Sequence, residues 1–135
     1  MSGFNDMIIA EFRANGGHVT TAGFGEDLVL LHTTGARSGA ERINPLMAIE
    51  TDGSWLVAAS AAGAPRHPDW YFNLVADAAA QVETGSGVVP VQATVLEGDE
   101  YAAGWDAFTK RSPAFAGYKE KAGDRVIPVV RLDPR

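Results

Sequence analysis

Three β-compatible segments follow one another between residues 28 and 60, and the connections between them are too short to contain a helix. The segments are Leu28–Thr34, Ile43–Glu50 and Ser54–Ser60. Parallel strands need a crossover connection of about a dozen residues or more. The connections here, GARSGAER and Thr51-Asp52-Gly53, instead have the glycine content of hairpin loops. This part of the chain therefore predicts antiparallel pairing and argues against a doubly wound parallel sheet.

The rest of the chain adds hairpins and helices to this start. The turn Gly85-Ser86-Gly87 separates two more predicted strands, and a last strand follows near the C-terminus. The six predicted strands are 28–34, 43–50, 54–60, 80–84, 88–96 and 126–132. The predicted helices are 4–15, 69–76 and a helix that begins near Asp99. We therefore predict a mainly β fold with helical insertions, in which a six-stranded antiparallel sheet can close into a small barrel.

Length, composition and charge limit the classes of protein to which this chain can belong. The 135 residues are enough for one core, so we expect a single domain over residues 1–135 with a short N-terminal helical extension at 1–17. The sequence has no cysteine, which removes disulfides and thiolate chemistry. It shows no signal-like or membrane-spanning segment, so we expect a cytoplasmic protein. The net charge of −6 argues against nucleic acid or an anionic membrane as the main partner, and an anionic ligand would need a local basic site.

Such a basic site is predicted in the loop between the first two strands. Gly35 and Gly39 enclose Arg37 and Ser38, and Arg42 follows at the start of the next strand. Glycines allow backbone N–H groups to turn toward one point, and a guanidinium with a neighbouring hydroxyl completes a cradle for an anion. The alternative is a solvated hairpin loop with incidental arginines, because glycine-rich turns are common.

A second candidate segment, AAGAPRHPDWYFN, follows the third predicted strand. Its small residues permit the close approach of a planar ligand, and Trp70 and Tyr71 can either form a wall for that ligand or pack in the core. The neighbouring Arg66 and His67 favour the first alternative, in which Trp70 forms a wall for the ligand. Asn73 can bind a ligand or satisfy a buried backbone group, and the sequence does not separate these two roles.

Hydrolytic and metal-dependent chemistry have little support. His67 precedes a Pro-Asp pair, but the sequence has no GxSxG nucleophile motif. His18, His32 and His67 share no metal-ligand spacing, so no metal site is predicted. His32 lies in an apolar strand and is expected to be a packed core or pocket-lining imidazole. GxGxxG and GxxxxGK[ST] motifs are also absent, which argues against Rossmann and P-loop nucleotide sites.

Three motifs of the chain resemble a known family. The motifs are TTGARSGAERINPL, ASAAGAPRHPDWYFNL and YKEKAGDRVIPVVRL. Together they are similar to the deazaflavin (coenzyme F420)-dependent nitroreductase-like oxidoreductases of actinobacteria, over about Asp27 to Leu132. The resemblance implies a split β-barrel like that of the FMN-binding flavin reductases. It also implies a deazaflavin cofactor with a phosphate and an oligoglutamate tail, whose reduced form donates a hydride.

The resemblance further implies which residues bind this cofactor. The first loop holds the phosphate and tail, the second strand runs along the cofactor, the third strand ends beneath the deazaflavin, and the helix start closes the pocket. In chain order these residues are Arg37, Ser38, Arg42, Asn44, Pro45, Met47, Ala59, Ser60, Ala61, Trp70, Tyr71 and Asn73.

The implied activity is hydride transfer from the reduced deazaflavin to an enone, quinone or lactone. Tyr118 and His67 are the candidates for orienting or protonating the substrate. Ser112 and Phe115 stand where nitroimidazole-reducing members place tyrosines, which argues against nitro reduction. A homodimer is expected, because the sheet edges left by short hairpins need cover. The alternatives are an FMN-binding flavin reductase and a non-catalytic module that carries deazaflavin, haem or a lipid.

Overall fold

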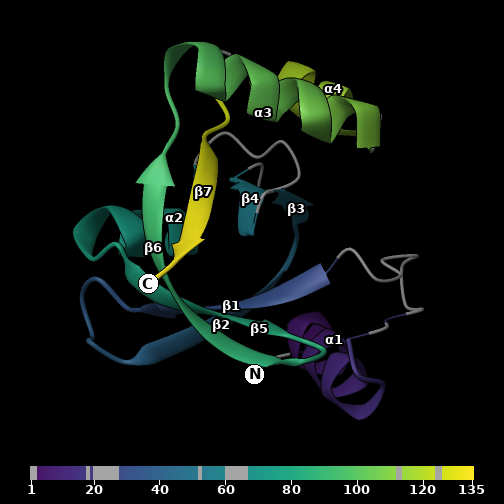
Figure 1. Cartoon of the computed structure of the whole chain (residues 1–135), viewed down its shortest axis with the longest axis vertical. Helices are drawn as coiled ribbons and strands as arrows, with labels where there is room; N and C mark the ends of the chain where they lie inside the picture. The colour runs from purple at the N-terminus through teal and green to yellow at the C-terminus, as the bar shows by residue number, and fades with distance from the viewer. Residues whose placement is uncertain are drawn as a thin grey trace.

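The computed structural model describes residues 3–17, 19, 28–51, 53–59, 67–111, 114–123 and 126–135. These residues form a strongly curled sheet with helices around it (Figure 1). The helices are α1 (Gly3–Ala14), α2 (Asp69–Ala76), α3 (Gly98–Arg111) and α4 (Ala114–Ala122). The strands are β1 (Leu28–Thr34), β2 (Glu41–Met47), β3 (Ile49–Thr51), β4 (Ser54–Ala58), β5 (Ala79–Thr84), β6 (Gly87–Val95) and β7 (Val129–Pro134). The mainly β, antiparallel prediction with helical insertions is confirmed.

The described strands form one antiparallel sheet of seven strands, in the order β2-β1-β5-β6-β7-β4-β3. The prediction of six strands was wrong, and the difference arises at Ala48. The chain predicted as one strand over 43–50 is divided there, because β2 pairs with β1 at one edge of the sheet and β3 pairs with β4 at the other. The strand assignment is interrupted at the buried Ala48, where the pairing changes from β1 to β4.

The first four residues of β1, LVLL, are apolar and buried on both faces of the sheet. Leu28 and Leu30 pack in a cluster with α1, whereas Val29 and Leu31 pack in the main core, which α2 completes. This division follows from the alternation of side chains along a strand. A third cluster joins α3 and α4 to β4 and β7. The longest helix of the described part, α3, has 14 residues, and no helix there is long and apolar enough to cross a membrane.

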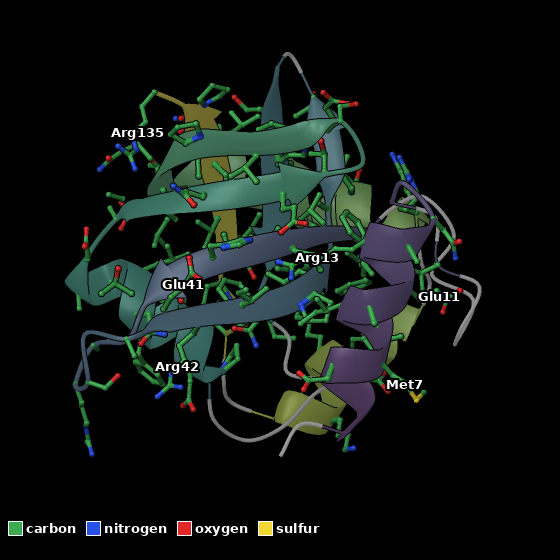
Figure 2. All side chains as sticks on the ribbon, turned by 90° about the horizontal axis from the view of Figure 1, so that it is seen from below. Met7, Glu11, Arg13, Glu41, Arg42 and Arg135 are labelled. Carbon is green, nitrogen blue, oxygen red and sulfur yellow. The ribbon has the colours of Figure 1, made fainter. Side chains whose placement is uncertain are left out.

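Helix α1 is attached to the sheet at its C-terminal end. Gly16 and Gly17 have φ angles of 64° and 98° and end the helix where the sequence predicted. Gly85, in the turn between β5 and β6, lies so close to the Gly16 carbonyl that an added Cβ would clash with it. Arg13 extends from α1 over the sheet and donates two hydrogen bonds of 2.9 Å to the carboxylate of Glu83 in β5 (Figure 2).

Candidate functional site

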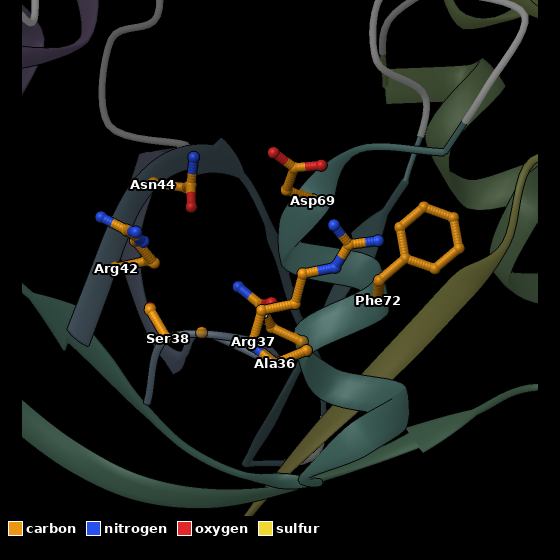
Figure 3. Close-up of a pocket in the computed structure, with 9 residues that line it drawn as sticks. Ala36, Arg37, Ser38, Arg42, Asn44, Asp69 and Phe72 are labelled. Atoms are coloured by element: carbon orange, nitrogen blue, oxygen red, sulfur yellow. Dashed lines mark hydrogen bonds between the residues drawn. The ribbon is translucent and has the colours of Figure 1, made fainter. Parts of the chain in front are cut away.

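An open hollow of about 710 Å³ lies between the β1–β2 loop, the start of β2 and helix α2 (Figure 3). We call it the arginine hollow. Its volume is within the range of about 300–1,000 Å³ that is usual for small-molecule sites. The described residues that line it are Gly35, Ala36, Arg37, Ser38, Arg42, Asn44, Asp69, Phe72 and Asn73. Five of the residues predicted to bind the cofactor thus come together in one place.

The β1–β2 loop has a defined conformation on the floor of this hollow. The Gly35 N–H donates to the Ala40 carbonyl at 2.8 Å, and the Gly39 N–H donates to the Gly35 carbonyl at 2.9 Å. Gly39 has a φ of 70°, which favours glycine. A Cβ at Gly35 would lie 2.7 Å from the Ser38 hydroxyl oxygen, so the close approach of that side chain requires glycine. These bonds hold a turn that carries Arg37 at its tip.

Asn73 attaches this loop to helix α2. Its Oδ1 accepts a hydrogen bond of 3.0 Å from the Ala36 backbone N–H, and its Nδ2 donates one of 3.1 Å to the Thr33 hydroxyl. Asn73 and Thr33 are 7% and 3% exposed. The amide of Asn73 thus binds a backbone group and positions the loop, and because Asn73 also lines the hollow, its role in binding a ligand stays a prediction.

The two arginines of the hollow come from different elements. Arg37 extends from the loop toward α2, whereas Arg42 lies with Asn44 on the side formed by β2 (Figure 3). Both arginines are exposed, and within the described part of the chain neither forms an ion pair with a carboxylate. Two guanidiniums on one hollow repel each other unless an anion lies between them. The carboxylate of Asp69 also lines the hollow, so the two guanidiniums leave it with one net positive charge and with the donors to bind an anionic ligand.

The alternation of β2 separates the predicted residues of this strand into two sets. Arg42 and Asn44 line the hollow, and Leu46 continues on the same face into the main core. Pro45 and Met47 fall on the opposite face, and Met47 packs against the cluster beneath α3 and α4. Pro45 and Met47 are thus not brought to the arginine hollow.

The residues predicted to surround the deazaflavin have different surroundings. Trp70 is 4% exposed and belongs to the main core, so the structure places it in the core and not on a wall. Ala59 is fully buried, and its N–H donates to the Pro128 carbonyl at 2.9 Å. Tyr71 is half-buried and packs against the main core. The predictions for residues 60 and 61 (Ser60 and Ala61) lie outside the described residues.

The two candidate catalytic residues are in separate places. His67 precedes α2, and its ring centroid lies 4.7 Å from that of Tyr71 and 5.8 Å from that of Phe72. Tyr118, on α4, packs edge-on against Phe115 at 5.3 Å in the cluster of α3 and α4. His67 is therefore connected to the arginine hollow through Phe72, whereas Tyr118 is not among the residues that line the hollow.

Sequence reasoning missed Asp69 and Phe72, which line the hollow from α2. The helix buries Trp70, Asn73 and Leu74, which are spaced as one face of a helix. Residues 69 and 72 are three apart on the other face, so a helical projection of 69–76 would have placed both on the exposed side.

His32 belongs to an ionic network and not to the core proper. Its Nε2 lies 2.9 Å from the Glu83 carboxylate, and its Nδ1 lies 3.2 Å from the Glu41 carboxylate. Glu83 also accepts the two hydrogen bonds from Arg13. These hydrogen bonds are the largest cause of the lowered pKa of Glu83; burial raises this pKa, and the contact with His32 lowers it further. This network connects α1, β1, β2 and β5. Among the described residues, no group of three or more histidine and carboxylate side chains is arranged to hold a metal ion.

Comparisons with known proteins agree on one family. The chain matches the F420H(2)-dependent quinone reductase family over residues 7–134. An F420H(2)-dependent quinone reductase of Mycobacterium tuberculosis is 32% identical over 110 residues, which cover 79% of this chain and 73% of that protein. The solved structure of an F420-H2 dependent reductase (FDR-A) is 41% identical with a TM-score of 0.73, covering 79% of this chain and 94% of the other. A further structure, described as a domain-swapped dimer, has the same identity and TM-score and covers 79% and 80% of the two chains.

Proposed function

The chain belongs to the F420H(2)-dependent quinone reductase family, and we propose that it reduces an electron-poor small molecule by hydride transfer from reduced coenzyme F420. Membership of this family makes the chain an oxidoreductase with coenzyme F420 as its cofactor. The resemblance predicted the cofactor correctly, although the matched family is named for quinones and not for nitro compounds. A quinone is therefore the first acceptor to test, and enones and lactones are further proposed acceptors.

One observation carries the proposal for the cofactor site: the arginine hollow holds two guanidiniums that have no carboxylate partner in the described part of the chain. This occurs in a protein with a net charge of −6, in which acidic partners are abundant. Guanidinium groups bind phosphate and carboxylate through paired hydrogen bonds. The resemblance implies a cofactor with a phosphate and a tail of carboxylates, so the donor set fits this group.

The residues of the hollow then have different tasks. Arg37, Arg42 and the Ser38 hydroxyl hold the phosphate and tail, and Asn44 adds a neutral amide beside Arg42. Asn73 acts on the cofactor indirectly, because it holds the loop that carries Arg37. When bound, the reduced deazaflavin supplies the hydride. The chain supplies orientation and a fixed charge.

For the proton that accompanies reduction, His67 is the better supported of the two candidates. Its ring contacts Phe72, which lines the arginine hollow, and an imidazole has two ring nitrogens that can donate or accept a proton. Tyr118 is held among aromatic side chains of α3 and α4. We propose His67 for this role, and Tyr118 only for a substrate that extends toward α4.

We propose further that the curled sheet is a split barrel and that the chain forms a homodimer. The support for the dimer is the relative of 41% identity whose structure is described as a domain-swapped dimer. Edge strands also gain from cover by a second chain. A single domain over residues 1–135 and a cytoplasmic location stay predictions from the sequence.

The test is a titration of the purified protein with coenzyme F420, in parallel with FMN, followed by turnover with a naphthoquinone. We expect F420 to bind much more tightly than FMN. Arg37→Ala should weaken F420 binding by about tenfold to a hundredfold, the value of one hydrogen bond to a charged group. Lys110→Ala is the matched control, because it also removes one positive charge but lies on α3, where Lys110 pairs with Asp106.

Three other results of these experiments would support other interpretations. Preference for FMN would favour a flavin reductase. F420 binding without turnover of quinones, enones or lactones would favour a cofactor-carrying module. Equal losses in the Arg37→Ala and Lys110→Ala variants would mean that net charge, and not the arginine hollow, attracts the cofactor.

A further inference from the structure

Strand β6 has an uncharged outer surface in the middle of the sheet. None of its nine residues is charged, although charged residues make up 21% of the chain. Val91 belongs to the main core, and the alternation of side chains places its neighbours Pro90 and Gln92 on the outer side. Gln81 of β5 lies directly opposite Pro90 and shares this side. The exposed residues of this outer surface, which we call the neutral face, are Gln81, Val88, Pro90, Gln92 and Thr94.

The helices leave the neutral face uncovered. Helix α1 packs over β1 and β2, where it covers Leu28, Leu30 and Ile43. Helices α3 and α4 pack over β4 and β7. Figure 2 shows α1 at one side of the sheet and the green strands β5 and β6 without a helix over them. Val88 is 51% exposed, so this surface also presents an apolar side chain to solvent.

The charged residues of the two flanking strands are already paired within the chain. Strands β5 and β7 contain three charged residues, which are Glu83, Arg131 and Asp133. Glu83 accepts its hydrogen bonds from Arg13 of helix α1. Arg131 donates to Asp133 at 3.0 Å and to Glu100 of helix α3 at 2.8 Å. A second surface can therefore cover the neutral face without leaving one of these charges buried and unpaired, which would be costly at an interface.

We propose that the neutral face is the surface through which two copies of this chain associate, related by a two-fold axis. Each copy has a net charge of −6, so two copies repel each other where acidic surfaces meet. A two-fold contact brings the same surface of both copies together, and an uncharged surface avoids this repulsion. The inference gives the proposed homodimer a defined surface, and it does not depend on coenzyme F420 as the cofactor.

Strand β6 can make this contact only through its side chains. It is paired on both sides, with β5 and with β7, so its backbone cannot accept a strand from another chain. Two sheets that pack face to face lie about 10 Å apart, with their side chains interdigitated. Interfaces of standard size bury about 800 Å² on each partner, and their centres are poor in charged residues while their rims are polar. The neutral face then forms the centre of the contact, and the paired side chains of Arg13 and Arg131 lie at its rim.

The experiment measures the association of the purified chain by sedimentation velocity over a range of protein concentrations. The variants Gln92→Glu and Gln92→Lys each place one charge on the neutral face, at an exposed position where the fold tolerates it. Ala103→Glu is the matched control, because it adds the same charge as Gln92→Glu on the exposed side of α3. Circular dichroism and thermal unfolding check that each variant is folded, and F420 binding is measured on the same samples.

We expect the wild type to form dimers and each Gln92 variant alone to associate about tenfold more weakly, because the two-fold axis brings two like charges together. An equimolar mixture of Gln92→Glu and Gln92→Lys should recover the affinity of the wild type, because opposite charges then meet. Ala103→Glu should associate as the wild type does.

Two results would overturn the proposal. One is a wild type that stays monomeric at all concentrations. The other is a dimer that both Gln92 variants leave intact, as expected for a dimer made by exchanged elements or through the edges of the sheet. F420 binding should be the same in the wild type and in Gln92→Glu. A wild type that forms the dimer but does not bind F420 would contradict the proposed function and leave the interface in place.

Discussion

Replacement of Asn73 by alanine removes two hydrogen bonds of helix α2, one to the β1–β2 loop at Ala36 and one to Thr33 at the end of β1. The Thr33 hydroxyl, on a residue only 3% exposed, loses its partner inside the protein, which costs about 1–3 kcal/mol. The Ala36 N–H belongs to an exposed residue, so water can replace Asn73 there, and the net loss is about 0.5–1.5 kcal/mol. We expect Asn73→Ala to lower the free energy of unfolding by about 1.5–4.5 kcal/mol, a large share of the roughly 5–15 kcal/mol that stabilises a typical domain.

Urea denaturation of Asn73→Ala and of the matched control Asn44→Ala separates stability from binding. Asn44 lines the same hollow, but its side chain makes no hydrogen bond within the described residues, so Asn44→Ala should change the free energy of unfolding by less than about 0.5 kcal/mol. Both variants should bind F420 more weakly, the first because the loop loses its anchor and the second because a donor is lost. The reasoning is refuted if Asn73→Ala is as stable as Asn44→Ala.

Two further predictions concern the attachment of α1. The pKa of Glu83 is lowered in the folded state, chiefly by hydrogen bonds from Arg13, so its contribution to stability is present above the ordinary pKa of 4.5 and is lost as pH falls through the folded value. Glu83→Gln should therefore lower the free energy of unfolding by about 1 kcal/mol at pH 7. The difference in this free energy between the variant and the wild type should become smaller below pH 4.5. A difference that denaturation curves show to be independent of pH would contradict this. Gly85→Ala should lower stability by about 1–3 kcal/mol because the new Cβ clashes with the Gly16 carbonyl. Gly117→Ala is the control, because Gly117 lies on an exposed part of α4 with open space around it, and this change should raise stability by about 0.4–1 kcal/mol. If both variants lose the same amount of stability, the clash is not the cause.

Elements with strong local signals could be predicted from the sequence. The helix predicted over 69–76 is observed as Asp69–Ala76, because Pro68 and the apolar spacing that follows define it locally. The hairpin at Gly85-Ser86 is likewise defined by its own turn residues. The interruption between β2 and β3 at Ala48 has no such local signal. It follows from the pairing of β2 and β3 with strands at opposite edges of the sheet, which is a property of the whole fold.

In the candidate site, too, features made by residues close in sequence could be predicted, whereas contacts between residues far apart in sequence could not. The cationic loop was recognisable because Arg37, Ser38 and Arg42 are close in sequence. The hydrogen bond from Ala36 to Asn73 joins residues 37 positions apart, and no short motif encodes it. How deeply an aromatic side chain is buried also depends on residues far away in the sequence. For this reason Trp70, which was predicted to form a wall for the ligand, lies in the core, whereas Phe72 lines the hollow.

Strand β7 is the last of the seven strands to leave the ribosome, yet it lies between β6 and β4 in the sheet. Until β7 is synthesised, the other described strands can pair only as two separate pieces, β2-β1-β5-β6 and the β3–β4 hairpin. Val130 and Leu132 of β7 belong to the main core, so that core stays open until β7 is synthesised. The nascent chain therefore exposes the apolar faces of both pieces to chaperones, and its folding is completed only when synthesis of the sheet ends.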